Sequence, residues 1–158
     1  MKTEHFSIHS LWKRYLHSLG EAPESTSKQY SAWHFCATQE AADELAQLVL
    51  SGTKHATTSS LWSIEAEGES LPMEGEISII TNWKGEAQCI IKTTAVEVMP
   101  YRDVPPEFAA SEGEGDKSLQ YWRRVHKEVF TQELKELGFV FSEDMPVVCE
   151  TFEVVWPQ

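Results

Sequence analysis

Three amphipathic helical segments, each closed by a glycine, constrain most strongly what this chain can fold into. Apolar side chains recur at helical spacing over residues 7–19, after a capping position at Thr38, and over residues 117–137. The predicted inner stripe of the last segment consists of Leu119, Trp122, Val129, Phe130, Leu134 and Leu137. Each segment is followed by a glycine that can adopt the left-handed backbone of a helix C-terminus: Gly20, Gly52 and Gly138. In a chain of 158 residues, three helices that stop this sharply predict one domain with strands between the helices.

Two stretches rich in Ile, Val and Thr predict a β-hairpin. They run over residues 76–81 and 87–99, and Asn82, Lys84 and Gly85 between them supply turn residues. The remaining predicted elements are an extended segment, a short helix and a final strand, at residues 53–61, 61–67 and 147–156. The expected fold class is therefore α+β, as a single domain over residues 1–158 with the N-terminal helix packed on it.

The final predicted strand places a carboxylate on its apolar face. By period-two alternation Glu150 shares a face with four apolar side chains: Val148, Phe152, Val154 and Trp156. An isolated buried carboxylate is costly, because burial disfavours its charged form. We therefore expect Glu150 either to have a cationic partner, which we favour, or to lie at the open end of a barrel.

The charge of the chain limits how it can bind nucleic acid. The sequence has 25 Asp and Glu residues against 13 Lys and Arg residues, a formal net charge of -12. Proteins that hold nucleic acid by neutralising its phosphates normally show a basic excess or a basic stripe. Any RNA contact is therefore expected to be local, in a small pocket with one or two cations.

Composition and termini predict a globular protein of the cytoplasm. Hydrophobic residues make up 41% of the chain, but no apolar run approaches the roughly 20 residues that span a bilayer, and no signal peptide is visible at the start. The three cysteines form no CxxC pair, and His5 and His9 lack a third ligand, so no metal site is predicted. No protein partner is inferred.

The segment with the most information for function contains Gly52, Lys54 and Thr57 in the spacing GxKxxT. This pattern follows a helix and opens an extended segment, and it resembles the signature of the ASCH domain family. The resemblance covers most of the chain, in particular the longer bacterial form of the family, through the segments at residues 71–76, 108–116 and 141–146. It implies a PUA-like fold, a small β-barrel with flanking α-helices, whose relatives bind RNA or modified nucleobases.

The resemblance also implies a catalytic trio of Lys54, Thr57 and Glu114. Glu114 matches an acidic position in family members that hydrolyse acetylated cytidine, although a carboxylate before a helix is also favoured simply by the helix N-terminus. Lysine offers a point charge with three donors, suited to a phosphate or a carbonyl oxygen. In a regular strand Lys54 and Thr57 would point to opposite faces, so a shared pocket requires a bulge or a late start of the strand.

Further residues are candidates for substrate binding. Tyr121 and Arg124 combine an aromatic ring with a cation as a base-stacking site does, although an ordinary helix surface looks the same in sequence. By resemblance, Ser142 and Asp144 line the same site, with turn formation as their alternative role. Gly52 contributes through its backbone, since a positive φ there fixes where the chain leaves the helix.

Three functions stay open at this point. In a ribonuclease, Lys54 would polarise a phosphate while Glu114 or another base deprotonates the attacking hydroxyl, and a divalent metal could take part. In an amidohydrolase of acetylated cytidine, Lys54 or a water that it activates would attack the acetyl carbonyl with help from Thr57 and Glu114. A non-catalytic RNA-binding module would only recognise a base. The resemblance to the longer form of the family favours the ribonuclease, and the acidic charge favours the amidohydrolase, because a nucleoside needs no extended phosphate track.

Overall fold

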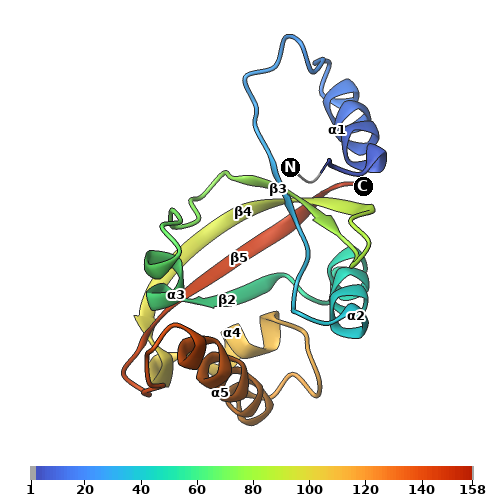
Figure 1. The fold of residues 1–158 in the computed structure, drawn as a ribbon. Coiled ribbons are helices and arrows are strands. Elements are labelled where there is room, and N and C mark those ends of the chain that lie inside the picture. The colour runs from blue at the N-terminus through green and yellow to red at the C-terminus, as the bar shows by residue number, and fades with distance from the viewer. Residues whose placement is uncertain (1–2, 158) are drawn as a thin grey trace. The chain divides into compact units, whose positions relative to one another are not determined.

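The structure, a computed structural model, describes residues 3–157 and has an α+β fold, as predicted. Within these residues it contains five α-helices, one 3-10 helix and five strands (Figure 1). In chain order they are α1 (Phe6–Ser18), β1 (Ser31–Trp33), α2 (Gln39–Leu50), β2 (Ala56–Ser60), α3 (Leu61–Ala66), β3 (Ile77–Thr81), β4 (Ala87–Pro100), η1 (Tyr101–Asp103), α4 (Pro106–Ser111), α5 (Leu119–Glu136) and β5 (Pro146–Trp156).

The strands follow the order β1-β3-β4-β5-β2 in one sheet. The predicted hairpin is formed by β3 and β4, which pair antiparallel, and its turn is closed by a hydrogen bond of 3.0 Å from Asn82 N to Glu86 O. β2 pairs antiparallel with β5, and β1 pairs parallel with β3. The sequence did not predict β1 or α4, because segments of three and six residues are too short to show a period.

The chain divides into two compact units, each with its own core. The first comprises residues up to 52, residues 75–92 and those from 153 onward, and the second comprises residues 53–74 and 93–152. In the first unit, α1 packs against the β3–β4 hairpin. The buried side chains there are Ile8, Trp12, Tyr15, Leu16, Ile79 and Ile90. This explains why the apolar stripe of residues 7–19 is so regular.

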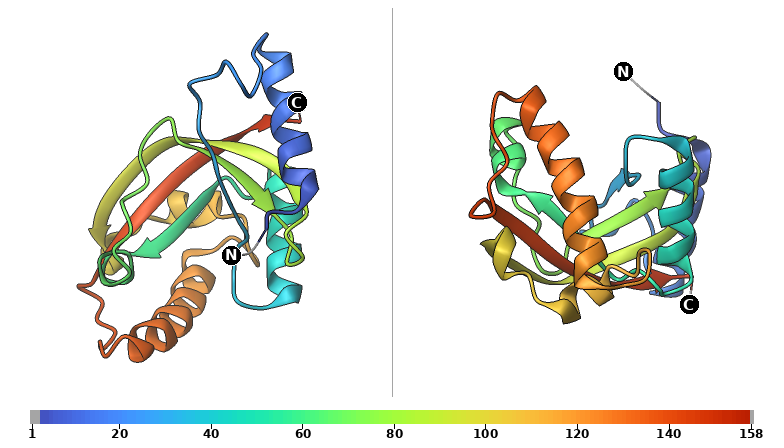
Figure 2. Two further views of the ribbon diagram at one scale, coloured as in Figure 1. Left: turned by 45° about the horizontal axis from the view of Figure 1, so that its top comes forward. Right: turned by 90° about the horizontal axis from the view of Figure 1, so that it is seen from below.

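The core of the second unit is built on α5, against which α3 and α4 both pack (Figure 2). Trp122, Phe130 and Leu134 are buried as predicted, together with Tyr101 and Met145 from the segments before α4 and β5. The sequence also predicted Val129 for this stripe, but its side chain is 50% exposed. The buried row follows every fourth residue of the helix, and Val129 lies about 100° around the helix from Phe130.

The turn between α4 and α5 is pressed against the segment that precedes β2. The backbone N–H of His55 donates to Ser111 O at 2.9 Å. Gly113 has a φ of 69°, and a Cβ there would lie 2.2 Å from the carbonyl oxygen of Thr53. Only glycine accommodates both the left-handed backbone and this close approach. The turn therefore places two glutamates, Glu112 and Glu114, beside Lys54.

The packing of α5 generates the first prediction, for which neighbouring residues give a matched pair. Phe130→Ala removes a side chain that is 2% exposed, and we expect it to lower the free energy of unfolding by about 3–5 kcal/mol. Val129→Ala should change it by less than about 0.5 kcal/mol. Urea unfolding followed by tryptophan fluorescence measures both values. Similar losses in the two variants would mean that α5 presents a different face to the core.

Candidate functional site

Lys54 is a buried cation whose ammonium is surrounded by acceptors. Its side chain is 1% exposed, and Nζ donates to Ala56 O at 2.8 Å, to Glu112 Oε1 at 3.1 Å and to Glu114 Oε2 at 2.9 Å. The residue lies just before β2, which begins at Ala56, so strand alternation does not fix its direction. The three donors of a lysine are thus directed at three protein oxygens.

Glu112 is the carboxylate at the centre of the cluster. Besides Lys54, its side chain accepts hydrogen bonds from Thr58 Oγ1 at 2.7 Å and from Trp122 Nε1, and His126 Nε2 lies 3.3 Å from Oε2. Burial raises the pKa of Glu112, but Lys54 and the contacts with His126 and Thr58 outweigh it and hold the pKa at about 2. Glu112 is therefore an ionised, fully partnered anchor.

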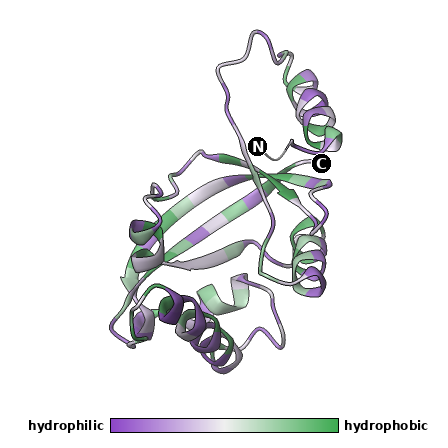
Figure 3. Ribbon diagram, in the orientation of Figure 1, coloured by the Kyte–Doolittle hydropathy of each residue, from purple (hydrophilic) through white to green (hydrophobic). Residues whose placement is uncertain are grey.

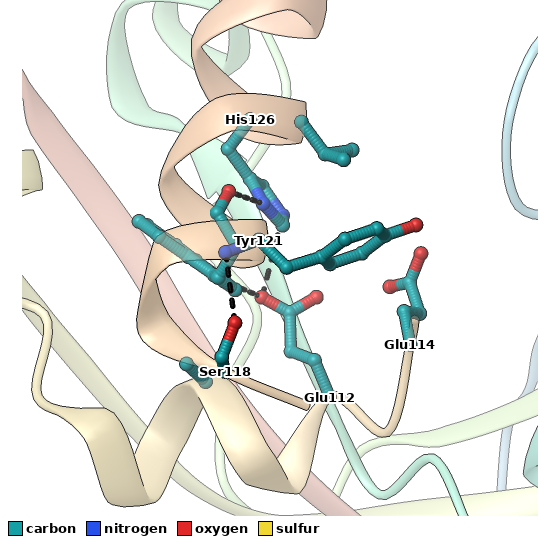
Figure 4. Close-up of a pocket in the computed structure, with 8 residues that line it drawn as sticks. Glu112, Glu114, Ser118, Tyr121 and His126 are labelled. Carbon is teal, nitrogen blue, oxygen red and sulfur yellow. Dashed lines mark hydrogen bonds and ion pairs between the residues drawn. The ribbon is translucent and has the colours of Figure 1, made fainter. Parts of the chain in front are cut away.

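Glu114 is the carboxylate that meets solvent. Its side chain is 20% exposed, while one of its oxygens is bonded to Lys54. It lines a small pocket that is partly open to solvent. The other lining residues are Ala109, Glu112, Ser118, Tyr121, Trp122, Val125 and His126. Figure 4 shows Glu112 and Glu114 facing Tyr121 and His126, which come from α5.

The aromatic wall of the pocket is fixed by its contacts. The His126 ring stacks on Trp122 with centroids 4.3 Å apart, and its Nδ1 lies 2.8 Å from Trp122 O. The Tyr121 ring lies directly on Gly115, where a Cβ would come within 2.4 Å of the ring atom Cζ. The Arg124 guanidinium sits 5.4 Å from the centre of the Tyr121 ring. An aromatic ring and a cation therefore stand at the edge of an acidic pocket.

The arrangement suits proton transfer more than electrostatic binding by lysine. A partly exposed carboxylate, Glu114, and the imidazole of His126 line the same pocket, and carboxylates and imidazoles are the side chains that serve most often as general base and acid. Lys54 can orient Glu114, but its buried ammonium is already directed at protein oxygens. The nearby thiol of Cys149, which pairs with Thr58 across β2 and β5, is no candidate nucleophile, because burial raises its pKa to about 12.

Comparison with known proteins places this chain in a family. A sequence profile of the ASCH domain matches residues 31–156. The chain belongs to the ASCH domain family. An ASCH domain from Lactobacillus crispatus, known from a crystal structure, shares 38% sequence identity with this chain. The two structures superpose with a TM-score of 0.87, and the match covers 98% of each chain. A protein of Enterococcus faecalis V583 is 35% identical with a TM-score of 0.84, covering 94% of this chain and 88% of the other.

These relatives confirm the fold class that the resemblance implied, a PUA-like α+β fold with helices flanking the sheet. A hypothetical protein, PH0355, shares the fold alone, at 15% identity and a TM-score of 0.52. No curated protein matches the ASCH domain described here. Within residues 3–157, no helix is long and apolar enough to span a membrane, and no three metal-ligating side chains are grouped to hold an ion.

The structure brings some of the predicted site residues of this ASCH domain together. Lys54 and Glu114 are in direct contact, and Tyr121 lines the same pocket with Arg124 on its ring. Thr57 pairs with Glu150 of β5, so by alternation it faces away from its neighbour Thr58, which bonds Glu112. That Thr57 acts in catalysis stays a prediction.

The remaining candidates lie outside the residues that line the pocket. Gly52 has a φ of 80° and follows the end of α2, as expected for a helix stop. Ser142 and Asp144 form a turn before β5, in which Asp144 N donates to Ser142 Oγ at 3.2 Å, and the Asp144 carboxylate forms an ion pair with Arg102. Glu150, for which we favoured a cationic partner, accepts a hydrogen bond of 2.8 Å from the Thr93 hydroxyl. That a cation also pairs with it stays a prediction.

Sequence reasoning missed three members of the cluster: Glu112, Thr58 and His126. Glu112 stands two residues from Glu114 in the same turn, and nothing in a glycine-rich acidic segment distinguishes the anchoring carboxylate from the exposed one. His126 did carry a signal, because it lies one helical turn after Trp122 in the buried row of α5. A histidine in an apolar row indicates a polar partner inside the core.

The shifted carboxyl makes the stability of the protein dependent on pH. The pKa of Glu112 in the folded protein, about 2, lies below its ordinary value of 4.5. The contribution of this carboxylate to the free energy of unfolding is therefore complete above about pH 5 and is lost as the pH falls from about 5 to 2. The difference corresponds to on the order of 3 kcal/mol. Urea unfolding at several pH values should show that Glu112→Gln flattens this acid dependence. Glu107→Gln, at an exposed carboxyl of α4, is the control that should keep it; parallel curves for both variants and the parent would contradict the assignment.

Proposed function

We propose that this ASCH domain binds single-stranded RNA at the pocket and cleaves its backbone, with Glu114 as the general base. The observation that carries the proposal is the state of Glu114: Lys54 fixes one carboxylate oxygen at 2.9 Å while the side chain opens into the pocket. A base held by a buried partner is oriented before substrate arrives, which is what efficient proton transfer needs. The family assignment supports RNA as the ligand class.

The reaction follows from the residues that line the pocket. Glu114 takes the proton of a ribose 2′-hydroxyl, and the freed oxygen forms a bond to the adjacent phosphorus while the bond from phosphorus to the 5′ oxygen breaks. The leaving oxygen takes a proton from water at the open side of the pocket, because both ring nitrogens of His126 already contact protein oxygens. The products are a 2′,3′-cyclic phosphate and a 5′-hydroxyl. Arg124, exposed beside Tyr121, supplies the positive charge that faces the phosphate.

In this proposal Lys54 acts as a positioning residue. The sequence suggested that Lys54 contacts the phosphate or attacks a carbonyl, but its ammonium is directed at Ala56 O, Glu112 and Glu114. Its contribution is to keep the carboxylate of Glu114 in one place. A stacked base on the Tyr121 ring would add sequence-tolerant affinity, since every base has a π face.

One observation favours a second candidate, the hydrolysis of acetylated cytidine. Two carboxylates, Glu112 and Glu114, line a small pocket whose lysine is buried, and a neutral nucleoside suits such a site better than a phosphate does. In that reaction Glu114 takes a proton from a water molecule, whose oxygen forms a bond to the acetyl carbon. The bond from that carbon to the exocyclic nitrogen of cytosine then breaks, the nitrogen takes the proton from Glu114, and acetate and cytidine are released. A third candidate is a module that binds a base without chemistry.

The test is the incubation of purified protein with a short RNA and, separately, with acetylated cytidine, followed by chromatography of the products. We expect shortened RNA with cyclic phosphate ends. Glu114→Gln should lower the rate about 10²- to 10⁴-fold, because it removes the general base. Asp116→Asn, an exposed acid on the same turn, is the matched control and should keep the parent rate.

Each other outcome selects a different function. Intact RNA together with release of cytidine and acetate would replace the ribonuclease by the amidohydrolase. Recovery of both substrates unchanged would leave a binding module. RNA cleavage that Glu114→Gln does not slow would contradict the role of Glu114, whichever substrate is used.

A further inference from the structure

We propose that the exposed face of the first half of α5 is a track for the phosphates of an oligonucleotide, next to the pocket. This inference rests on the proposed function and deepens it, since it names the substrate as a strand of several nucleotides. A nucleoside carries no phosphate, and a dinucleotide is too short to extend from the pocket along the track.

The local charge of this helix is opposite to that of the protein. Residues 117–127 contain four cations, Lys117, Arg123, Arg124 and Lys127, and no acidic residue, in a chain with a formal net charge of -12. This segment is the local basic site that the composition required of any RNA contact. Figure 3 shows that the ribbon of α5 is largely hydrophilic in colour.

Helical spacing places three of these cations, all except Lys117, on one face of α5. Gln120, Arg123, Arg124 and Lys127 follow the pattern i, i+3, i+4, i+7 and are all exposed. Arg124 is also three residues after Tyr121, and its guanidinium lies 5.4 Å from the centre of that ring. The stripe therefore begins at the wall of the pocket and runs away from it along the helix.

The contacts of the stripe hold it in place and leave its charges at the surface. Arg123 Nη2 donates to Arg102 O at 3.4 Å, and Lys127 Nζ lies 6.0 Å from the centre of the Phe141 ring. Two acids lie near Arg124. Glu128 is exposed and follows it by four residues, on the same face of α5. The pKa of Asp116 is lowered mainly by its hydrogen bonds to Ser118 and in part by Arg124. Arg123 and Lys127 are thus the charges most open to a phosphate.

The distribution of charge along α5 is the reverse of what helix stability favours. Cations stabilise a helix near its C-terminus and acids near its N-terminus, because of the helix dipole. In α5 three of the four cations lie in the first half, whereas the acids all lie in the second half, beside Lys135: Glu128, Glu133 and Glu136. The stability of a solvated helix gives no reason for this order of charges. A surface that binds phosphates with the first half of the helix accounts for it.

The test uses a fluorescent single-stranded RNA of eight nucleotides with 2′-O-methyl groups, which cannot be cleaved by a 2′-hydroxyl. Fluorescence anisotropy gives its Kd across a series of salt concentrations. The double variant Arg123→Gln/Lys127→Gln is compared with Lys84→Gln/Lys135→Gln, which removes the same charge from exposed positions outside the stripe. Thermal melting confirms that both variants fold.

For the track variant we expect binding weakened at least about tenfold at low salt. Its slope of log Kd against log salt should fall by about 1.4, since each phosphate contact to a single strand contributes about 0.7. The control should keep the parent slope. Equal slopes in the two variants, or no salt dependence in the parent, would overturn the inference.

Cleavage of a dinucleotide separates this inference from the proposed function. The track variant should cleave a dinucleotide at the parent rate, because Arg123 and Lys127 are not among the residues that line the pocket. If the parent binds the eight-nucleotide RNA through the track but cleaves no RNA, the phosphate track is supported and the ribonuclease activity is contradicted. If the parent cleaves RNA and the track variant binds RNA as tightly as the parent, the ribonuclease activity is supported and the track is contradicted.

Discussion

The ion pair between Lys54 and Glu112 is the interaction on which the rest of the site depends. Both side chains are almost fully buried, and they join the segment before β2 to the turn between α4 and α5. A buried pair repays its loss of hydration only if the remaining polar atoms are also satisfied. Here Thr58, Trp122 and His126 contact the same carboxylate. The pair and these contacts therefore hold the segment around β2 to the turn between α4 and α5 and to α5 itself.

This anchor explains how two similar glutamates acquire different roles. Glu112 is enclosed by donors from β2 and α5, so its charge is used inside the protein. Glu114 shares Lys54 with it but lies at the surface of the pocket. Gly113 between them makes the close approach to the backbone of Thr53 possible. One turn thus supplies both a rigid support and an accessible carboxylate.

Patterns within one element were predictable from the sequence, and contacts between elements were not. The β3–β4 hairpin, the stop at Gly52 and the buried row of α5 follow from local periodicity and glycine chemistry. The contact between Lys54 and Glu114 joins residues 60 positions apart, and only the resemblance to the ASCH domain family suggested it. The burial of Lys54 had no local signal, because lysine is rarely buried without a partner and its partner Glu112 looked like an ordinary turn acid.

A double-mutant cycle between Lys54 and Glu112 tests this account most directly. The free energy of unfolding is measured for the parent, for Lys54→Met, for Glu112→Gln and for the double variant. Each single change strands a buried charge and should cost about 3–5 kcal/mol. The double variant should therefore be destabilised by much less than the sum of the two single changes, with a coupling of about 2 kcal/mol or more. If the loss of unfolding free energy in the double variant equals the sum of the two single losses within about 0.5 kcal/mol, the claim that this pair organises the site is contradicted.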